Sequence, residues 1–400
     1  MNRRYAVALA ALVLVACAEP PSTPSVPVQR SVGDEAPLFA KSSGGDPIAG
    51  QYIVVFNDAV ADAHGKAKEK SLKHGGKLKF SYGAVLKGFA AELSDDAVAA
   101  LRADPDVAYV EQDQTVSIST TQSPAPSWGL DRIDQRNLPL SNSYTYNATA
   151  AQQTVVRAYI IDTGIQTSHP DFGGRASAVY DAIGDGRNGQ DCNGHGTHVA
   201  GTVGGSTYGV AKSIKLRAVR VLNCSGSGSN SGVIAGMDWV RVNGIHPAVA
   251  NMSLGGGFSS ATNTAANNLA ASGVFLAVAA GNSNASACNS SPSSAANVTS
   301  VAASASNDTR ASFSNFGSCV HIYAPGVSIK SDWLNSGTNT ISGTSMASPH
   351  VAGVGALYKA VNGDASYSTI RSWLINNATL NVISGNPSGT PNRLLYKSTF

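Results

Sequence analysis

The stretch VVRAYIIDTG, residues 155–164, is an apolar run that ends in a polar, glycine-containing turn. Three further apolar runs occupy residues 214–222, 248–254 and 274–279. Continuous apolar runs of this length are typical of parallel strands that are buried on both faces of a sheet. Helical stretches alternate with them and are expected to begin near His198, Ser231, Ala261 and Ser345. The alternation predicts an α/β fold with a doubly wound, mostly parallel sheet, in which ligands bind at the carboxyl ends of the strands.

Composition and charge exclude several classes of protein. The chain has 400 residues, of which only 13% are charged, about half the usual fraction. No sustained heptad pattern is present, which excludes a coiled coil. Residues 121–400 contain no cluster of Lys and Arg among aromatic residues, so we expect no nucleic-acid partner. The charge is unevenly distributed: residues 121–400 carry 16 Lys and Arg against 11 Asp, whereas residues 19–120 carry 10 basic against 14 acidic residues. The opposite signs indicate that the two parts attract each other.

The N-terminus has the pattern of an export signal. It has a basic start, an apolar run of 11 residues at 5–15 and small residues at 16–18, and this run is too short to span a bilayer. We predict a signal peptide at residues 1–18, cleaved after Ala18. Residues 14–17 also resemble a bacterial lipobox, in which Cys17 would be lipidated, and both alternatives stay open. Residues 19–48 are rich in Pro, Ser and Gly and are predicted to form a linker.

Residues 49–119 are predicted to form a small α+β domain that precedes the main domain at 120–400. Strands are expected at residues 52–56, 78–82, 88–93 and 107–110, and helices at 62–74 and 95–102. Ser94 is placed to cap the second helix. The order strand, helix, two strands, helix, strand is typical of a ferredoxin-like sandwich.

Export makes disulfide bonds possible. Besides Cys17, the chain has Cys192, Cys224, Cys288 and Cys319. These four allow three pairings, and the sequence alone does not choose among them. The pairing of neighbours, Cys192–Cys224 and Cys288–Cys319, is our prediction for comparison with the structure. Its two loops, with sequence separations of 32 and 31, would each contribute about 3–4 kcal/mol in the entropic model.

Polar residues follow the predicted strands, where a cleft is expected. Asp162 follows the first strand, and Asn282 follows the strand at 274–279 after a glycine-rich bend. Ser345 lies between a glycine and a helix. A serine hydroxyl becomes a nucleophile when a neutral histidine takes its proton, and a carboxylate must orient that histidine. His195 is the candidate base, although composition alone also permits His198 or His350.

The chain order Asp162, His195, Ser345 differs from that of the α/β-hydrolases, in which the serine comes first. This order argues against an esterase or lipase of that type. Asn282 is the candidate amide donor for an oxyanion. An alternative hypothesis is an inactive relative of such enzymes that serves as a binding or structural protein.

Four segments resemble the motifs of the subtilisin-like serine proteases, particularly the proteinase K and aqualysin branch. They are IIDTGI at 160–165, NGHGTHVAG at 193–201, AAGN at 279–282 and SGTSMASPHVAG at 342–353. The resemblance extends over residues 128–395. It implies a serine endopeptidase that works through an acyl-enzyme: Asp162 orients His195, which acts as base and then acid. Ser345 attacks, and Asn282 with the Ser345 N–H binds the oxyanion.

The resemblance also implies a substrate cleft. Gly226, Ser227 and Gly228 would pair with an extended substrate as an added strand. Ser253, Leu254 and Gly255 would form the opposite wall. Ala279, Ala280 and Gly281 would line the primary specificity pocket. Small side chains there leave room for a large apolar or aromatic residue before the scissile bond, and we expect broad specificity.

Residues 50–113 resemble the inhibitor-type propeptide of the same family, notably in GFAA at 88–91 and VAYVEQD at 107–113. The resemblance implies that this domain assists folding and blocks the cleft, as an intramolecular inhibitor, until it is cut off. We place the cut at Ser119–Thr120. The expected product is a secreted monomer that acts on proteins and peptides.

Structural calcium is the only cofactor that the resemblance implies, and no catalytic cofactor is expected. Oxygen ligands at short spacing suit the ion. The first candidate loop contains Asp131, Asp134, Gln135, Ser141 and Asn142, and the second contains Asp181 and Asp185. His321 stands where close relatives have a calcium-binding Asp, and a neutral imidazole is a poor ligand for calcium, so we expect no ion there.

Overall fold

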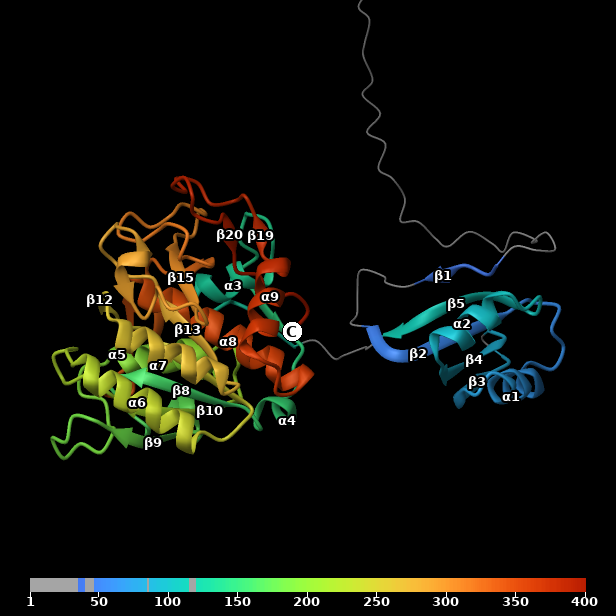
Figure 1. The fold of residues 1–400 in the computed structure, drawn as a ribbon, viewed down its shortest axis with the longest axis horizontal. Coiled ribbons are helices and arrows are strands. Elements are labelled where there is room, and N and C mark those ends of the chain that lie inside the picture. Colours follow the sequence, from blue (N-terminus) through green and yellow to red (C-terminus); the bar gives the residue numbers. More distant parts are fainter. Residues whose placement is uncertain (1–34, 40–46, 85, 115–119) are drawn as a thin grey trace, which may run out of the picture. The chain divides into compact units, whose positions relative to one another are not determined.

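The computed structural model describes residues 35–39, 47–84, 86–114 and 120–400. The chain divides into two compact units, Met1–Val116 and Ser117–Phe400 (Figure 1). The predicted signal peptide at 1–18, including Cys17, lies outside the described residues, as do residues 19–34 and 40–46 of the predicted linker. The predicted cleavage site is only half covered, because Ser119 lies outside them as well.

The smaller unit is a five-stranded sheet with two helices packed on it. Its strands, in spatial order, are β1 (Leu38–Phe39), β5 (Val107–Gln114), β2 (Pro47–Phe56), β4 (Gly88–Glu92) and β3 (Lys77–Tyr82). Helices α1 (Ala63–Lys73) and α2 (Asp95–Arg102) contribute Ala67 and Leu101 to a core with Phe89. Ser94 accepts the N–H of Ala97 and so caps α2 as predicted. The order of the helices and of strands β2 to β5 confirms the ferredoxin-like pattern.

Strand β1 is a difference from the prediction. Leu38 pairs in parallel with Val110 of β5. Ala36 is fully buried, and its N–H donates to the Arg102 carbonyl at 2.7 Å. Residues 35–39 therefore belong to the smaller unit and not to the linker. A strand of two residues has no periodicity to reveal it, because contacts with distant residues hold it in place.

The larger unit is built on a nine-stranded sheet (Figure 1). Its strands, in spatial order, are β19 (Thr379–Leu380), β20 (Arg393–Leu394), β16 (Ile322–Pro325), β15 (Thr299–Ser304), β13 (Phe275–Ala279), β11 (Ala248–Met252), β8 (Arg157–Asp162), β10 (Lys215–Arg220) and β9 (Ala176–Asp181). All neighbours are parallel except β19 and β20. The mostly parallel sheet confirms the predicted α/β class.

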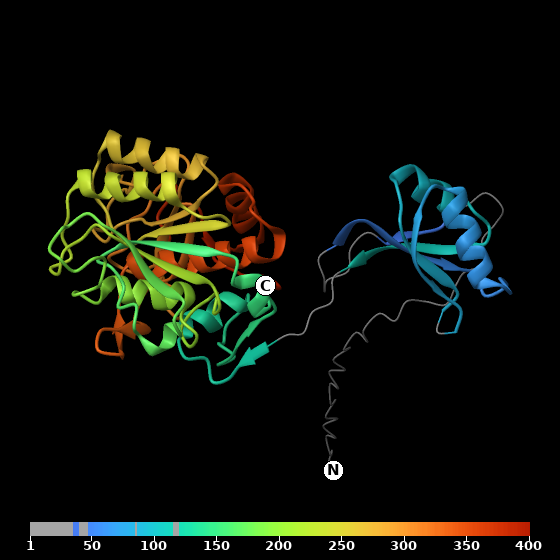
Figure 2. The same cartoon turned by 90° about the horizontal axis from the view of Figure 1, so that it is seen from below.

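Helices cover both faces of this sheet. They are α3 (Trp128–Asp134), α4 (Ala150–Gln153), α5 (His195–Gly204), α6 (Asn230–Asn243), α7 (Ser260–Ala271), α8 (Thr344–Asn362) and α9 (Tyr367–Asn377). The four predicted helices start within three residues of the expected positions, as α5 to α8. Figure 2 shows α6 and α7, in yellow-green and yellow, along one face of the sheet.

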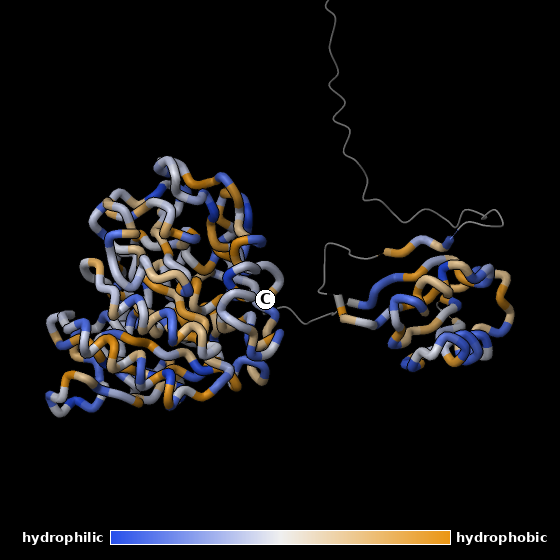
Figure 3. The backbone as a smooth tube through the Cα atoms, in the orientation of Figure 1, coloured by the Kyte–Doolittle hydropathy of each residue, from blue (hydrophilic) through white to orange (hydrophobic). Residues whose placement is uncertain are grey.

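Alternation along β8 explains the two layers. Tyr159 and Ile161 pack in the core beneath α6 and α7. Ala158 and Ile160 face the other way, into the core that α5 and α8 complete. Successive side chains of a strand point to opposite faces, so a strand covered by helices on both sides must be apolar throughout. Figure 3 shows such hydrophobic segments in the interior of the larger unit.

Short elements complete the larger unit. They are the pairs β6 (Thr120–Gln122) with β7 (Tyr144–Tyr146), β12 (Gly256–Gly257) with β14 (Ser290–Ser291) and β17 (Ile329–Trp333) with β18 (Gly337–Ile341), and the 3-10 turns Pro170–Phe172 and Ala287–Asn289. Within the described ranges, no helix combines the length and the apolar character needed to cross a membrane.

Candidate active site

The sheet topology places the candidate residues at its carboxyl edge. Asp162 is the last residue of β8, and Asn282 follows β13 by three residues. His195 and Ser345 are the first and second residues of α5 and α8. Helix N-termini carry a partial positive charge that favours a nearby anion. Four segments that are distant in sequence therefore each contribute one candidate residue to this edge.

His195 and Asp162 form a direct pair. His195 Nδ1 lies 2.7 Å from Asp162 Oδ1, and the carboxylate is fully buried. A hydrogen on Nδ1 can bond the carboxylate, which leaves Nε2 as the acceptor nitrogen of a neutral ring. Burial by itself lowers the pKa of His195. The charge and hydrogen bond of Asp162, with a smaller effect of Asp191, outweigh burial and raise that pKa above its ordinary value.

The other two candidate histidines bond backbone carbonyls and not a carboxylate. His198 Nε2 lies 3.0 Å from the Ile329 carbonyl, and His350 Nδ1 lies 2.8 Å from the Met346 carbonyl. Burial lowers the pKa of each to about 4. Of the three histidines, only His195 pairs with a carboxylate, so His195 remains the candidate base.

Asp191 is a residue of this site that the sequence analysis missed. Its buried carboxylate accepts five hydrogen bonds of 2.6–3.0 Å, one of them from the residue that follows Asp162 and the others from the segment around His195. The donors are the Thr163 hydroxyl, the N–H groups of Asn193, Gly194 and Thr197, and the Thr197 hydroxyl. Asp191 thus joins the two segments that carry the pair. The sequence offered one indication of this role. Asp191 lies four residues before His195, in a domain that has few carboxylates.

The Asn282 amide has a fixed orientation. Its Oδ1 accepts the backbone N–H and the hydroxyl of Thr344, both at 2.8 Å. A backbone N–H can only donate, so Nδ2 must face away from Thr344. A methyl group built on Gly343 would lie 3.5 Å from Asn282 Nδ2 and 3.5 Å from the Ser345 backbone N. The Asn282 amide nitrogen and the Ser345 backbone nitrogen are thus equally distant from one point beside Gly343, which makes them the candidate donors to an oxyanion.

Ser345 is also hydrogen-bonded to Ser253, the residue that directly follows β11. Its hydroxyl donates to the Ser253 carbonyl at 3.0 Å, and the Ser253 hydroxyl donates to the Ser345 carbonyl at 2.7 Å. Ser345 itself is half-buried. This structure pairs the Ser345 hydroxyl with a carbonyl, so proton transfer to His195 requires the hydroxyl to turn.

Two adjoining hollows form the predicted cleft. The first, of about 510 Å³, is lined by His195 and residues 226–228. The second, of about 600 Å³, is lined by residues 279–281, Asn282 and Ser345. Residues 253–256 line both hollows. The three predicted substrate segments thus surround the polar groups described above.

The first candidate calcium loop is closed by its own hydrogen bonds. Asp131 accepts the N–H and hydroxyl of Ser141 at 3.1 and 2.9 Å and the N–H of Asn142 at 2.6 Å. Gln135 Oε1 accepts the Ser141 N–H at 3.0 Å, and Asp134 accepts another backbone N–H. These bonds hold the loop together, and calcium binding by its five candidate residues stays a prediction.

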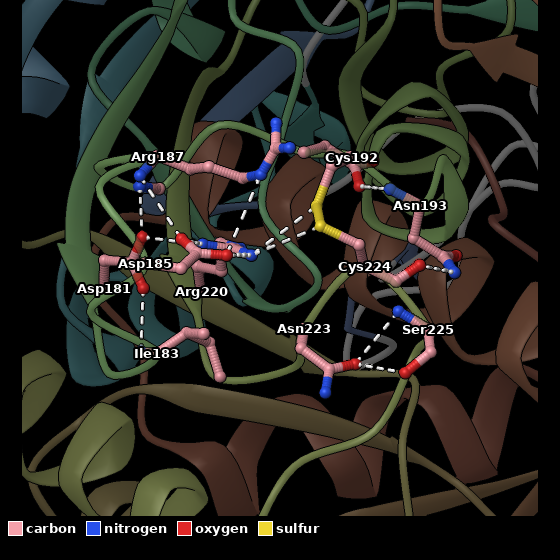
Figure 4. Close-up of polar contacts among 12 residues, drawn as sticks. Asp181, Ile183, Asp185, Arg187, Cys192, Asn193, Arg220, Asn223, Cys224 and Ser225 are labelled. Atoms are coloured by element: carbon pink, nitrogen blue, oxygen red, sulfur yellow. Dashed lines mark hydrogen bonds and ion pairs between the residues drawn. A yellow bond between two sulfur atoms is a disulfide. The ribbon is translucent and has the colours of Figure 1, made fainter.

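The two carboxylates of the second candidate loop bond an arginine. Asp181 and Asp185 both bond Arg220, with Asp181 Oδ2 3.0 Å from Nη1 and Asp185 Oδ2 2.8 Å from Nη2 (Figure 4). Arg220 is fully buried. The positive charge at these carboxylates belongs to the protein itself, which argues against the predicted calcium there. The sequence did not reveal this pairing because Arg220 lies on another strand, 35 residues beyond Asp185.

The structure contains the disulfides Cys192–Cys224 and Cys288–Cys319. The first links the segment before His195 to the segment before residues 226–228. Asn193 Nδ2 also donates to the Cys224 carbonyl at 2.9 Å (Figure 4). One edge of the cleft is therefore fixed to the chain that carries the candidate base.

A carboxylate-bound histidine, a serine at a helix start and two neighbouring N–H groups are features typical of the class of serine hydrolases. Comparisons with known proteins identify the family. Residues 155–394 match the "Subtilase family", and residues 51–119 match "Peptidase inhibitor I9". The chain therefore belongs to the subtilase family and is a serine proteinase with an inhibitor-type propeptide, which confirms the predicted resemblance.

Similar proteins agree with this family. The chain is 48% identical to an extracellular serine proteinase of Thermus sp. (strain Rt41A), over 97% of each chain. It is 44% identical to proteinase R of Parengyodontium album, over 94% of this chain and 96% of the relative. Among solved structures, it is 53% identical to a cold adapted subtilisin-like serine proteinase, with a TM-score of 0.66 over 69% of this chain and 99% of the other.

Proposed function

We propose that the chain is a secreted, self-maturing serine endopeptidase whose nucleophile is Ser345. The observation that carries this proposal is the 2.7 Å bond between His195 Nδ1 and the buried Asp162 carboxylate, at the sheet edge that also holds Ser345. A buried carboxylate in this position selects the ring tautomer in which Nε2 accepts a proton.

In the proposed mechanism, Ser345 Oγ attacks the scissile carbonyl carbon while His195 Nε2 takes the hydroxyl proton. The carbonyl oxygen becomes an oxyanion between Asn282 Nδ2 and the Ser345 N–H. His195 then gives its proton to the departing amine, which leaves an acyl-enzyme at Ser345. Water adds to the ester carbonyl, again through His195, and releases the acid and the free hydroxyl.

Substrate preference follows from the cleft. The segment at 226–228 is exposed and can pair with an extended peptide through its backbone, which tolerates most side chains. The small residues Ala279, Ala280 and Gly281 leave space for a large apolar or aromatic side chain before the scissile bond. We therefore propose broad endopeptidase activity with that preference.

The propeptide domain is proposed to inhibit the proteinase intramolecularly until it is cut off near Ser119–Thr120. Residues 51–119 match an inhibitor family, and the charges of the two parts are opposite in sign. Secretion is supported by the N-terminal signal pattern and by the extracellular relative. We propose that the mature enzyme acts as a monomer.

Self-maturation can be tested by the intact mass of purified wild-type and Ser345→Ala chains after the same incubation. We expect the wild type to split near residue 120 and the variant to stay joined. Equal cutting of both chains would mean that another protease performs maturation. An uncut wild type would contradict the proposal.

The pH dependence of activity should reflect His195. The base must be neutral to accept a proton, and its pKa is raised in the folded enzyme. The value of kcat/KM should therefore rise with pH along a limb whose midpoint lies above about 6.5, the unperturbed value for histidine. A series of kcat/KM measurements between pH 5 and 9 checks this. A flat profile, or a midpoint below the unperturbed value, would argue against His195 as the base.

Removing the Asn282 amide donor should lower kcat about 10²–10³-fold, the cost known for the corresponding donor of subtilisin itself, with little change in KM. Asn282→Leu removes both amide functions. Asn282→Asp retains an oxygen for Thr344 but has no N–H, and it should lose at least as much. Asn268→Leu, at an exposed position of α7, is the control. Wild-type kcat in Asn282→Asp would refute the donor role.

A further inference from the structure

Arg371 on α9 bonds two backbone carbonyls of a neighbouring loop. Its Nη1 donates to the Ala296 oxygen at 2.7 Å and to the Val298 oxygen at 3.1 Å. The same Nη1 lies 3.5 Å from Nε2 of His321, which directly precedes β16. His321 Nδ1 accepts the Ser300 N–H at 3.1 Å, so the neutral ring carries its hydrogen on Nε2 and accepts nothing from the guanidinium. The guanidinium thus links α9 to the loop that leads into β15.

His321 stands where the family resemblance implies a calcium-binding Asp, and subtilases generally bind structural calcium. The groups that could act as ligands around His321 do not suit that ion. Two carbonyl oxygens are hard ligands, but the third group is a neutral imidazole, since burial and the charges of Arg371 and Arg393 lower its pKa to about 4. Calcium prefers six to eight oxygens, carboxylates among them, and a guanidinium already contributes positive charge here.

Arg220 of β10, toward the opposite edge of the sheet from β16, likewise bonds oxygens that were candidate calcium ligands. The carboxylates of Asp181 and Asp185, which resembled calcium ligands in sequence, both bond its buried guanidinium (Figure 4). Among the residues that the structure describes, no group of three or more His, Cys, Asp and Glu side chains is placed to hold a metal ion. At both places, the loop with Asp181 and Asp185 and the surroundings of His321, the family resemblance implies a calcium ion, and an arginine of the chain lies there.

We infer that the Arg371 guanidinium replaces a structural cation at the Ala296 and Val298 carbonyls, so that the loop at 296–298 is held to α9 without calcium. A guanidinium can serve in this way because it is always charged and directs several N–H donors at oxygen atoms in a fixed geometry. The charge is covalently attached, so a chelator cannot remove it. This inference does not depend on the catalytic proposal, because folding stability reports on it.

The test is thermal unfolding of the full chain, with Ser345→Ala in every variant to prevent self-digestion. Midpoints are measured in calcium and in EDTA. The difference between the two midpoints is compared with that of the parent, because calcium bound elsewhere contributes equally to every variant. Arg371→Met should lower the midpoint by about 3–6 °C, since it removes charge-assisted hydrogen bonds. Calcium should not restore the loss. Arg241→Met, at an exposed position of α6, is the matched control and should leave the midpoint unchanged.

A second variant tests the replacement directly. His321→Asp with Arg371→Ala removes the guanidinium and adds a carboxylate beside the two carbonyl oxygens. This variant should unfold at a higher temperature in calcium than in EDTA, and calorimetric titration should detect calcium binding that the parent lacks. The inference is overturned if Arg371→Met unfolds at the parent's temperature. It is also overturned if the double variant depends on calcium no more than the parent does.

Discussion

Ser345→Ala is expected to lower kcat on an added protein substrate by about 10⁶-fold, the value known for the corresponding serine of subtilisin itself. The residual rate would come from the N–H donors and from binding, which the substitution leaves in place. Once the propeptide has been removed in trans by another protease that is then separated, KM should change little, because the hydroxyl takes part in the reaction and not in substrate binding. Initial rates of hydrolysis of that protein substrate at saturating concentration measure the effect.

The matched control is Ser368→Ala. Ser368 is the second residue of α9, just as Ser345 is the second residue of α8, and it is exposed. If serines at helix starts matter only as local hydrogen-bond partners, the two substitutions will have similar small effects. More than one per cent of wild-type activity in a contaminant-free Ser345→Ala preparation would exclude Ser345 as the nucleophile.

Asp162→Asn should reduce kcat about 10⁴-fold while the fold is retained. An amide in place of the buried carboxylate can donate to Nδ1, which favours the tautomer with its proton on Nε2, where the base is needed. The substitution also removes the charge that raises the pKa of His195. The acid limb of the profile should therefore move to lower pH in whatever activity remains.

Asp238→Asn is the control for Asp162→Asn, because Asp238 is exposed on α6 and distant in sequence from the site. Steady-state kinetics from pH 5 to 9, with thermal unfolding of each variant, separates loss of catalysis from loss of folding. An Asp162→Asn enzyme with wild-type kcat and an unmoved acid limb would contradict the assigned role of Asp162.

The sheet and the positions of the site residues could be predicted because local pattern determines them. The run that becomes β8 is apolar at every position, since helices cover both of its faces. Parallel strands bring their carboxyl ends to one edge, so Asp162 and Asn282 were expected to lie near each other. The choice of His195 over His198 and His350 needed the structure, because only the fold shows which imidazole meets the buried carboxylate.

The charged contacts could not be predicted for a different reason. Arg220 and Arg371 meet partners on other elements, and neither segment has a local pattern that reveals such a partner. Asp181 and Asp185 had the spacing of metal ligands, yet a guanidinium and a calcium ion satisfy such oxygens in similar ways. Sequence spacing shows where carboxylates gather, whereas the fold determines which cation they meet.

Covalent labelling with a fluorophosphonate tests most directly that Ser345 is a nucleophile activated by His195. In this reaction Ser345 Oγ displaces fluoride from phosphorus and forms a stable ester. We expect one label per wild-type molecule, located at Ser345 by peptide fragmentation, and none in His195→Ala over the same time. A label on a different serine, or equal labelling of the His195→Ala variant, would contradict the proposed mechanism.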